Sequence, residues 1–76
     1  MLEKVILNIE LYKFREEKNN QFLAFNVYNA NMYLFKGNIK NVLYSLYSGQ
    51  QIKKCDIEKK YLDFLVEKKI IVLLEN

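Results

Sequence analysis

The sequence predicts an α+β fold, with an N-terminal three-stranded antiparallel sheet followed by two to three helices and a short C-terminal strand. Apolar residues alternate with a period of two in the first half of the chain. In the second half they recur at helical spacing, and Gly37 and Gly49 divide that half into segments. The chain has 76 residues, so we expect a single domain over residues 1–76.

The first two strands are predicted to form a hairpin. Val5, Leu7, Ile9 and Leu11 share one face of an extended segment, with polar residues on the other face. The polar run REEKNN at residues 15–20 ends in two asparagines that tolerate turn geometry, which predicts the hairpin loop. The return strand is expected at residues 21–28.

A third strand is predicted at residues 32–36, MYLFK, after a tight turn at residues 29–31. This strand is apolar on both faces. In a three-stranded meander it lies at an edge, so its outward side is a candidate docking surface. An edge of this kind can also pair with a second copy of the chain, which leaves a homodimer as one alternative.

The first predicted helix begins with Asn38 as its N-cap and ends at Gly49, where a left-handed residue suits a helix C-terminus. Lys40 is expected on its solvent face. The residues expected to face inward, at helical spacing, are Ile39, Val42, Leu43, Leu46 and Tyr47.

The last predicted helix begins with Asp56 as its N-cap, and residues 50–55 before it, QQIKKC, are too few for more than one helical turn. Residues 70–74, IIVLL, predict the final strand. The residues expected on the inner face of this helix are Ile57, Tyr61, Phe64 and Leu65.

The residue inventory argues against an enzyme. The chain has no His, and its single Cys55 has no base to activate it and no partners to build a metal site. The carboxylates fall on predicted outward faces or loops. We therefore expect no catalytic residue, no metal and no cofactor.

Charge and hydropathy limit the classes of partner that we expect this chain to bind. The net charge is +3, and Arg15 is the only Arg among twelve basic residues, which argues against a dedicated nucleic-acid binder. A solvated face is the expected role of the lysine pairs, with attraction of an acidic partner as the alternative; the pairs are Lys53-Lys54, Lys59-Lys60 and Lys68-Lys69. No apolar run approaches the length of a membrane span and the N-terminus lacks signal-peptide features, so we expect a soluble, cytoplasmic protein without membrane contacts.

The aromatic residues divide into two predicted groups. Six Tyr and five Phe in a Trp-free chain fit either a core or a recognition surface. Their phase predicts that Phe25, Phe64 and Tyr47 are core residues. Tyr33, Phe35 and Tyr61 are expected to lean toward an exposed docking surface.

The order of elements resembles the PqqD-like family, the small winged-helix domains known as RiPP recognition elements. The segments LFKGNIKNVLYSLYSG, residues 34–49, and DIEKKYLDFLVEKKIIV, residues 56–72, are similar to the family's helix ending in Gly and to its final helix. Asp63-Phe64-Leu65 aligns with the core of that final helix. The chain departs from the family between Gly49 and Asp56, where the usual second helix is reduced to QQIKKC.

This resemblance implies a stand-alone protein that binds the leader of a ribosomally made precursor peptide and presents it, like a chaperone, to a separate modifying enzyme of natural product biosynthesis. The leader of such a precursor adds as a strand to the third strand and packs against the last helix, a mode known as β-augmentation. Carried over by position, the peptide-binding residues are Met32, Tyr33, Leu34, Phe35, Ile57, Lys60, Tyr61, Phe64 and Lys68.

Two other functions remain open from the sequence. A winged-helix DNA-binding protein would place Lys59 and Lys60 of the last helix in the major groove, although that helix has no Arg, Ser or Thr. A small bacteriocin immunity or homodimeric interaction protein fits the size and the basic charge, but such proteins are mostly helical.

Overall fold

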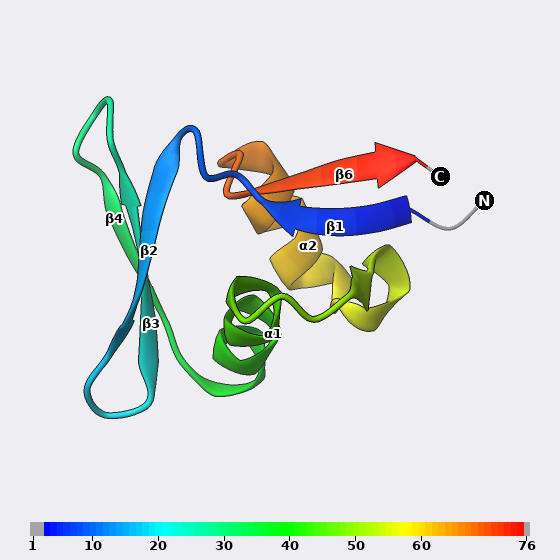
Figure 1. Cartoon of the computed structure of the whole chain (residues 1–76), viewed down its shortest axis with the longest axis horizontal. Coiled ribbons are helices and arrows are strands. Elements are labelled where there is room, and N and C mark those ends of the chain that lie inside the picture. Colours follow the sequence, from blue (N-terminus) through cyan, green and yellow to red (C-terminus); the bar gives the residue numbers. More distant parts are fainter. Residues whose placement is uncertain (1–2, 76) are drawn as a thin grey trace.

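A computed structural model describes residues 3–75 and has two small antiparallel sheets with two helices (Figure 1). One sheet has the strand order β2-β3-β4, and the other has the order β5-β1-β6. The predicted α+β class is confirmed, with a three-stranded meander followed by two helices and a C-terminal strand. The elements in chain order are β1 (Glu3–Leu7), β2 (Tyr12–Glu17), β3 (Gln21–Asn26), β4 (Met32–Phe35), α1 (Gly37–Tyr47), β5 (Ile52–Lys53), the 3₁₀ turn η1 (Lys54–Asp56), α2 (Lys59–Glu67) and β6 (Ile71–Glu75).

The N-terminal segment differs from the prediction, because residues 5–11 are not one strand. β1 ends at Leu7 and β2 begins at Tyr12 in the other sheet. Between them the Asn8 side chain accepts a hydrogen bond from the Leu11 N–H at 3.3 Å and donates one to the Lys69 carbonyl at 3.0 Å. Ile9, expected on the buried face, is 79% exposed. Alternation continues through this turn, so the pattern of apolar residues did not reveal it.

The predicted hairpin is confirmed as β2-β3, although residues 15–17, expected in its loop, belong to β2. Its turn covers residues 18–20, where Asn19 and Asn20 both have a φ of 63°. Asparagine tolerates this left-handed region better than most residues do. β4 pairs with β3 alone, so the third strand of the meander lies at an edge, as predicted.

The second sheet joins the two ends of the described chain. β1 pairs antiparallel with β6 along its length and with the short β5 on its other side. Val5, Leu7 and Ile71 face the core from this sheet. The final apolar strand is confirmed, whereas its pairing with β1 had no signal in the sequence.

α1 ends as the sequence predicts and begins differently. Gly49 has a φ of 91°, its N–H donates to the Leu46 carbonyl, and the Gln50 N–H donates to the Ser45 carbonyl, the pattern of a Schellman C-cap. The prediction of Asn38 as N-cap is wrong, because the helix begins at Gly37 after an extended Lys36 that makes no side-chain cap.

The prediction that Lys40 lies on the solvent face of α1 is also wrong, since it is 6% exposed. Its ammonium lies 3.2 Å from both Glu16 Oε2 and Asn20 Oδ1, and 4.9 Å from the centroid of the Tyr44 ring. The end of the β2-β3 hairpin supplies Glu16 and Asn20 and covers this side of α1, whereas Tyr44 belongs to α1 itself. Conversely, Tyr47 was expected inside and is 53% exposed.

The N-cap of α2 is Glu58, two residues later than the predicted Asp56. Asp56 belongs to η1, where its Oδ2 accepts the Lys53 N–H at 3.0 Å, so it caps that turn instead of α2. Within α2, Leu62 and Leu65 are the buried residues. The predicted inner residues Tyr61 and Phe64 are half-buried and pack at the margin of the core.

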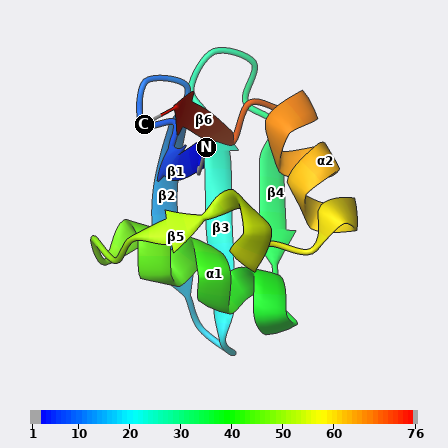
Figure 2. The ribbon, with the colours of Figure 1, turned by 90° about the vertical axis from the view of Figure 1, so that its right-hand side faces the viewer.

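A single hydrophobic core unites both sheets and both helices. Figure 2 shows α1 crossing one face of the β2-β3-β4 sheet, with β5 and β1 on its other side. No helix among residues 3–75 has the length and apolarity to span a membrane. The buried residues of this core are Val5, Leu7, Tyr12, Phe22, Ala24, Phe35, Ile39, Leu43, Ile57, Leu62, Leu65, Ile70 and Ile71.

Candidate functional site

The outer edge of β4 is the place where the predicted site residues come closest together. β4 has β3 on one side, and Figure 2 shows α2 flanking its other side. The Tyr12 hydroxyl donates to the Lys68 carbonyl at 2.7 Å, and the Tyr12 and Tyr33 ring centroids are 6.3 Å apart. The C-terminal end of α2 is thereby fixed near the beginning of β4.

The backbone groups at this edge can be assigned from the register. The Asn26 N–H donates to the Asn31 carbonyl at 2.8 Å, immediately before the paired residues of β3 and β4. Bonded and non-bonded pairs alternate along an antiparallel ladder, so Tyr33 and Phe35 bond to β3. The N–H and C=O groups of Met32 and Leu34 therefore point away from β3, toward the free edge.

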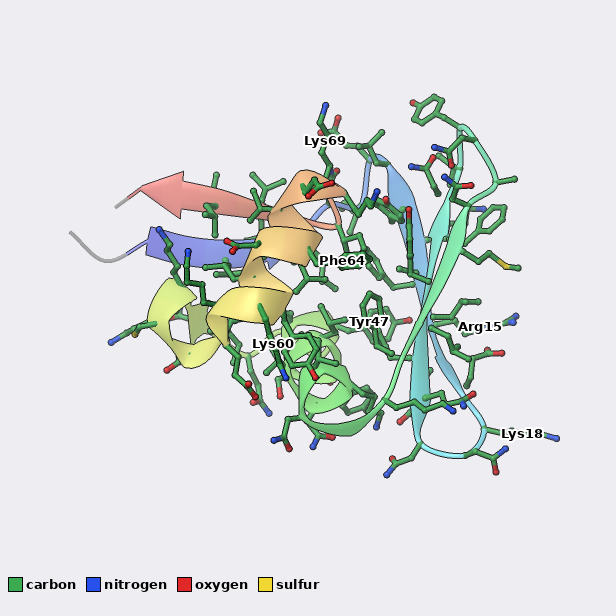
Figure 3. The ribbon with its side chains drawn as sticks, turned by 180° about the vertical axis from the view of Figure 1, so that it is seen from behind. Arg15, Lys18, Tyr47, Lys60, Phe64 and Lys69 are labelled. Carbon is green, nitrogen blue, oxygen red and sulfur yellow. The ribbon has the colours of Figure 1, made fainter. Side chains whose placement is uncertain are left out.

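The side chains of β4 also alternate. Tyr33 and Phe35 face α2, with ring centroids 5.6 Å and 6.3 Å from that of Phe64, both in edge-to-face geometry. Figure 3 shows Phe64 on the side of α2 that faces the sheet. Phe35 is buried and belongs to the core, so it supports this ring cluster from beneath. It is therefore not the exposed docking residue that its sequence position suggested.

The remaining strand residues predicted for the site point to the opposite face. Met32 is 64% exposed and Leu34 is 50% exposed. They lie in register with Phe25 and Leu23 of β3. Phe25 was predicted to be a core residue but is half-buried on this outer face. The prediction failed because β3 is apolar on both faces, so its sequence does not reveal which face is inward.

The beginning of α2 adds a pocket. A pocket of about 340 Å³ opens beside the first turn of α1 and the segment that leads into α2. The predicted site residues Ile57 and Tyr61 both line it, Ile57 as a buried residue. Lys60 projects beside it with its ammonium 5.0 Å from the Tyr61 ring centroid (Figure 3). The full lining is Asn38, Ile39, Val42, Asp56, Ile57, Glu58 and Tyr61.

Lys68 lies at the C-cap of α2, away from this pocket. Its ammonium is 4.0 Å from Glu67 Oε1, and its backbone carbonyl is the acceptor for Tyr12. Sequence reasoning missed Tyr12 and Asn8, which together hold the end of α2. No local pattern marks either residue, since their partners are about 60 positions away.

This region presents aromatic rings, aliphatic side chains and lysine ammonium groups. Within residues 3–75, no three His, Cys, Asp or Glu side chains lie together as a metal site would require. Cys55 is an exposed free thiol. Comparisons with family models, curated proteins and solved structures find no match to this chain.

Proposed function

We propose that this chain is a cytoplasmic, non-catalytic peptide-binding protein of the PqqD-like kind. It binds the leader of a ribosomally made precursor and presents it to a separate modifying enzyme. The observation that carries the proposal is the unpaired backbone of Met32 and Leu34, directed to a free edge that α2 flanks. No cofactor is needed for this role.

The geometry suits β-augmentation. An added strand takes its affinity from main-chain hydrogen bonds to β4 and its selectivity from side-chain contacts beside the strand. Its inward side chains meet Tyr33, Phe64 and Tyr61. The pocket beside Tyr61 lies close to where β4 leads into α1, within reach of one further side chain of an added strand.

In the segment where the family is expected to have an additional helix, this chain has the short β5 and η1. The β4 edge and α2 do not depend on that helix, because Tyr12, Asn8 and the Phe64 ring contacts fix α2 against the meander. The proposed kinship with this family is supported by the order of elements and by this pairing of an edge strand with a final helix.

The test is a titration of the purified chain with synthetic, fluorescein-labelled leader peptides encoded beside its gene. We expect Leu34→Pro to weaken binding about tenfold or more, because it removes an edge N–H that the added strand would use. Proline is tolerated on an edge strand where the N–H faces solvent, so the fold should persist. Leu34→Ala keeps the N–H and is the matched control, with a smaller loss.

Two side-chain variants complete the test independently of the proline. Tyr33→Ala and Tyr61→Ala should each weaken binding of the leader peptide, since both tyrosines lie half-buried at the margin of the proposed site. Micromolar binding that survives both substitutions and Leu34→Pro would rule out this site. The absence of binding by every encoded leader would rule out the function.

A further inference from the structure

The outer face of the β2-β3-β4 sheet is apolar although it faces solvent. Leu23 and Phe25 of β3 lie in register with Leu34 and Met32 of β4. None of these four belongs to the core cluster or to the residues packed against it. A depression of about 500 Å³ lies partly on this face, where Lys13, Arg15, Leu23, Phe25 and Met32 line it, and it also includes Phe14 and Tyr47 from the α1 side of the sheet.

This apolar face is continuous with the free β4 edge. Side chains of neighbouring strands stand side by side on each face of a sheet, about 5 Å apart. A strand added to β4 therefore places every second side chain beside Met32 and Leu34. The intervening side chains fall on the other face, beside Tyr33 and the Phe64 ring.

Lysines lie near both ends of the edge, alongside carboxylates, since Asp56 and Glu58 line the pocket beside Tyr61 and Glu67 pairs with Lys68. β4 itself carries no charged residue, and Lys36 follows it as an exposed side chain. Lys60 lies on α2 beside Tyr61, and Lys68 lies at the far end of the same helix. On the outer face, Lys13 and Arg15 of β2 flank Phe25 and Leu23, with Arg15 paired to Glu17. A bound segment with acidic residues at its ends complements these lysines.

We propose that the outer sheet face is the second half of the peptide site, and that the chain selects a segment with consecutive apolar residues between acidic ends. This inference rests on the proposed function and specifies its ligand. An ordinary surface strand alternates apolar and polar residues, whereas here both faces of the added strand meet apolar side chains. The outer face would thus exclude alternating segments that a one-sided site accepts.

Three matched fluorescein-labelled synthetic peptides provide the probe. The first has only apolar residues between acidic ends, the second has serine at every other central position, and the third has lysine at its ends. We expect the second to bind about tenfold more weakly, because in either register it loses apolar contacts on one face. The third should also bind more weakly, most clearly at low salt.

Two protein variants test whether the outer sheet face contributes to the affinity for the first peptide. Met32→Ser should weaken the first peptide several-fold without changing the melting temperature, since Met32 is largely exposed in the free chain. The control is Ile9→Ser, an equivalent change at an exposed apolar residue in the β1-β2 turn, which should leave binding unchanged.

The outcomes separate the two proposals. Equal binding of the first and second peptides, with Leu34→Pro still disrupting the site, overturns this inference and leaves the proposed function standing. If no peptide and no encoded leader binds, both fall. Sedimentation that finds a dimer of the free chain, dissociated by Met32→Ser, would show that a second copy covers this face and would also overturn the inference.

Discussion

Among the residues that the structure describes, Lys40 is the one buried charged residue. Its neighbours explain why a charge is tolerated there. An unpaired ammonium removed from water is costly, so buried lysines require partners. Here Glu16 supplies a carboxylate, Asn20 an amide oxygen and Tyr44 a ring face. Glu16 and Asn20 come from the β2-β3 hairpin, so this cluster fastens the hairpin to α1.

We predict that Glu16→Ala lowers the free energy of unfolding by about 1–2 kcal/mol, because it leaves the Lys40 ammonium without its carboxylate. Urea denaturation followed by circular dichroism measures this change. Glu17→Ala removes the exposed pair with Arg15 and should cost no more than about 0.5 kcal/mol. Equal effects of the two substitutions would contradict the structural role given to Lys40.

At the scale of elements, the position of α2 depends on contacts distant in sequence. The Tyr12 hydroxyl and the Asn8 amide bind the carbonyls of Lys68 and Lys69, which a helix C-terminus leaves without intrahelical partners. Ile70 then pairs with Asn8 and leads into β6. The junction of the two sheets therefore also fixes the helix beside the β4 edge.

We predict that Tyr12→Phe lowers the free energy of unfolding by about 1 kcal/mol, because the Lys68 carbonyl loses its partly buried donor. Leader binding should weaken with it, since α2 is less firmly held beside β4. Thermal denaturation and the peptide titration measure the two effects. Tyr28→Phe, at a residue that is 79% exposed, is the control and should change neither quantity.

Local sequence patterns predicted well those elements whose structure depends on residues close together in the chain. Helical spacing and Gly49 located α1, the polar REEKNN run located the hairpin, and the meander order placed β4 at an edge. The division between β1 and β2 at Asn8 was not predictable, because it depends on a hydrogen bond to Lys69. The β5-β1-β6 sheet joins segments far apart in sequence and has no local signature.

The candidate site was predictable in outline and not in detail. The sequence correctly indicated an edge strand, and the residues carried over from the resemblance lie on β4 and on or beside α2. The orientation of individual side chains was not predictable, since β3 and β4 are apolar on both faces. Phe35 is consequently core and Phe25 lies outside, the reverse of their assignments from sequence.

For the whole molecule, the two small sheets leave a short chain with an incompletely covered surface. A 76-residue domain buries a modest share of its apolar area, and such domains often gain stability from a partner. In this chain the uncovered apolar area and the free backbone meet at β4, beside α2, whose Lys59 and Lys60 are balanced in charge by Asp63 and Glu67. A peptide that adds there would extend the sheet, cover Met32 and Leu34, and lie near Lys36 and Lys60.

The most direct test of this account is amide hydrogen exchange of the free chain and of its complex with a leader peptide, followed residue by residue by NMR. We predict that the Met32 and Leu34 amides exchange rapidly in the free chain and become at least about tenfold slower in the complex. Tyr33 and Phe35, already bonded to β3, should be protected in both states. Saturating peptide that leaves the exchange of Met32 and Leu34 unchanged would contradict strand addition at this edge.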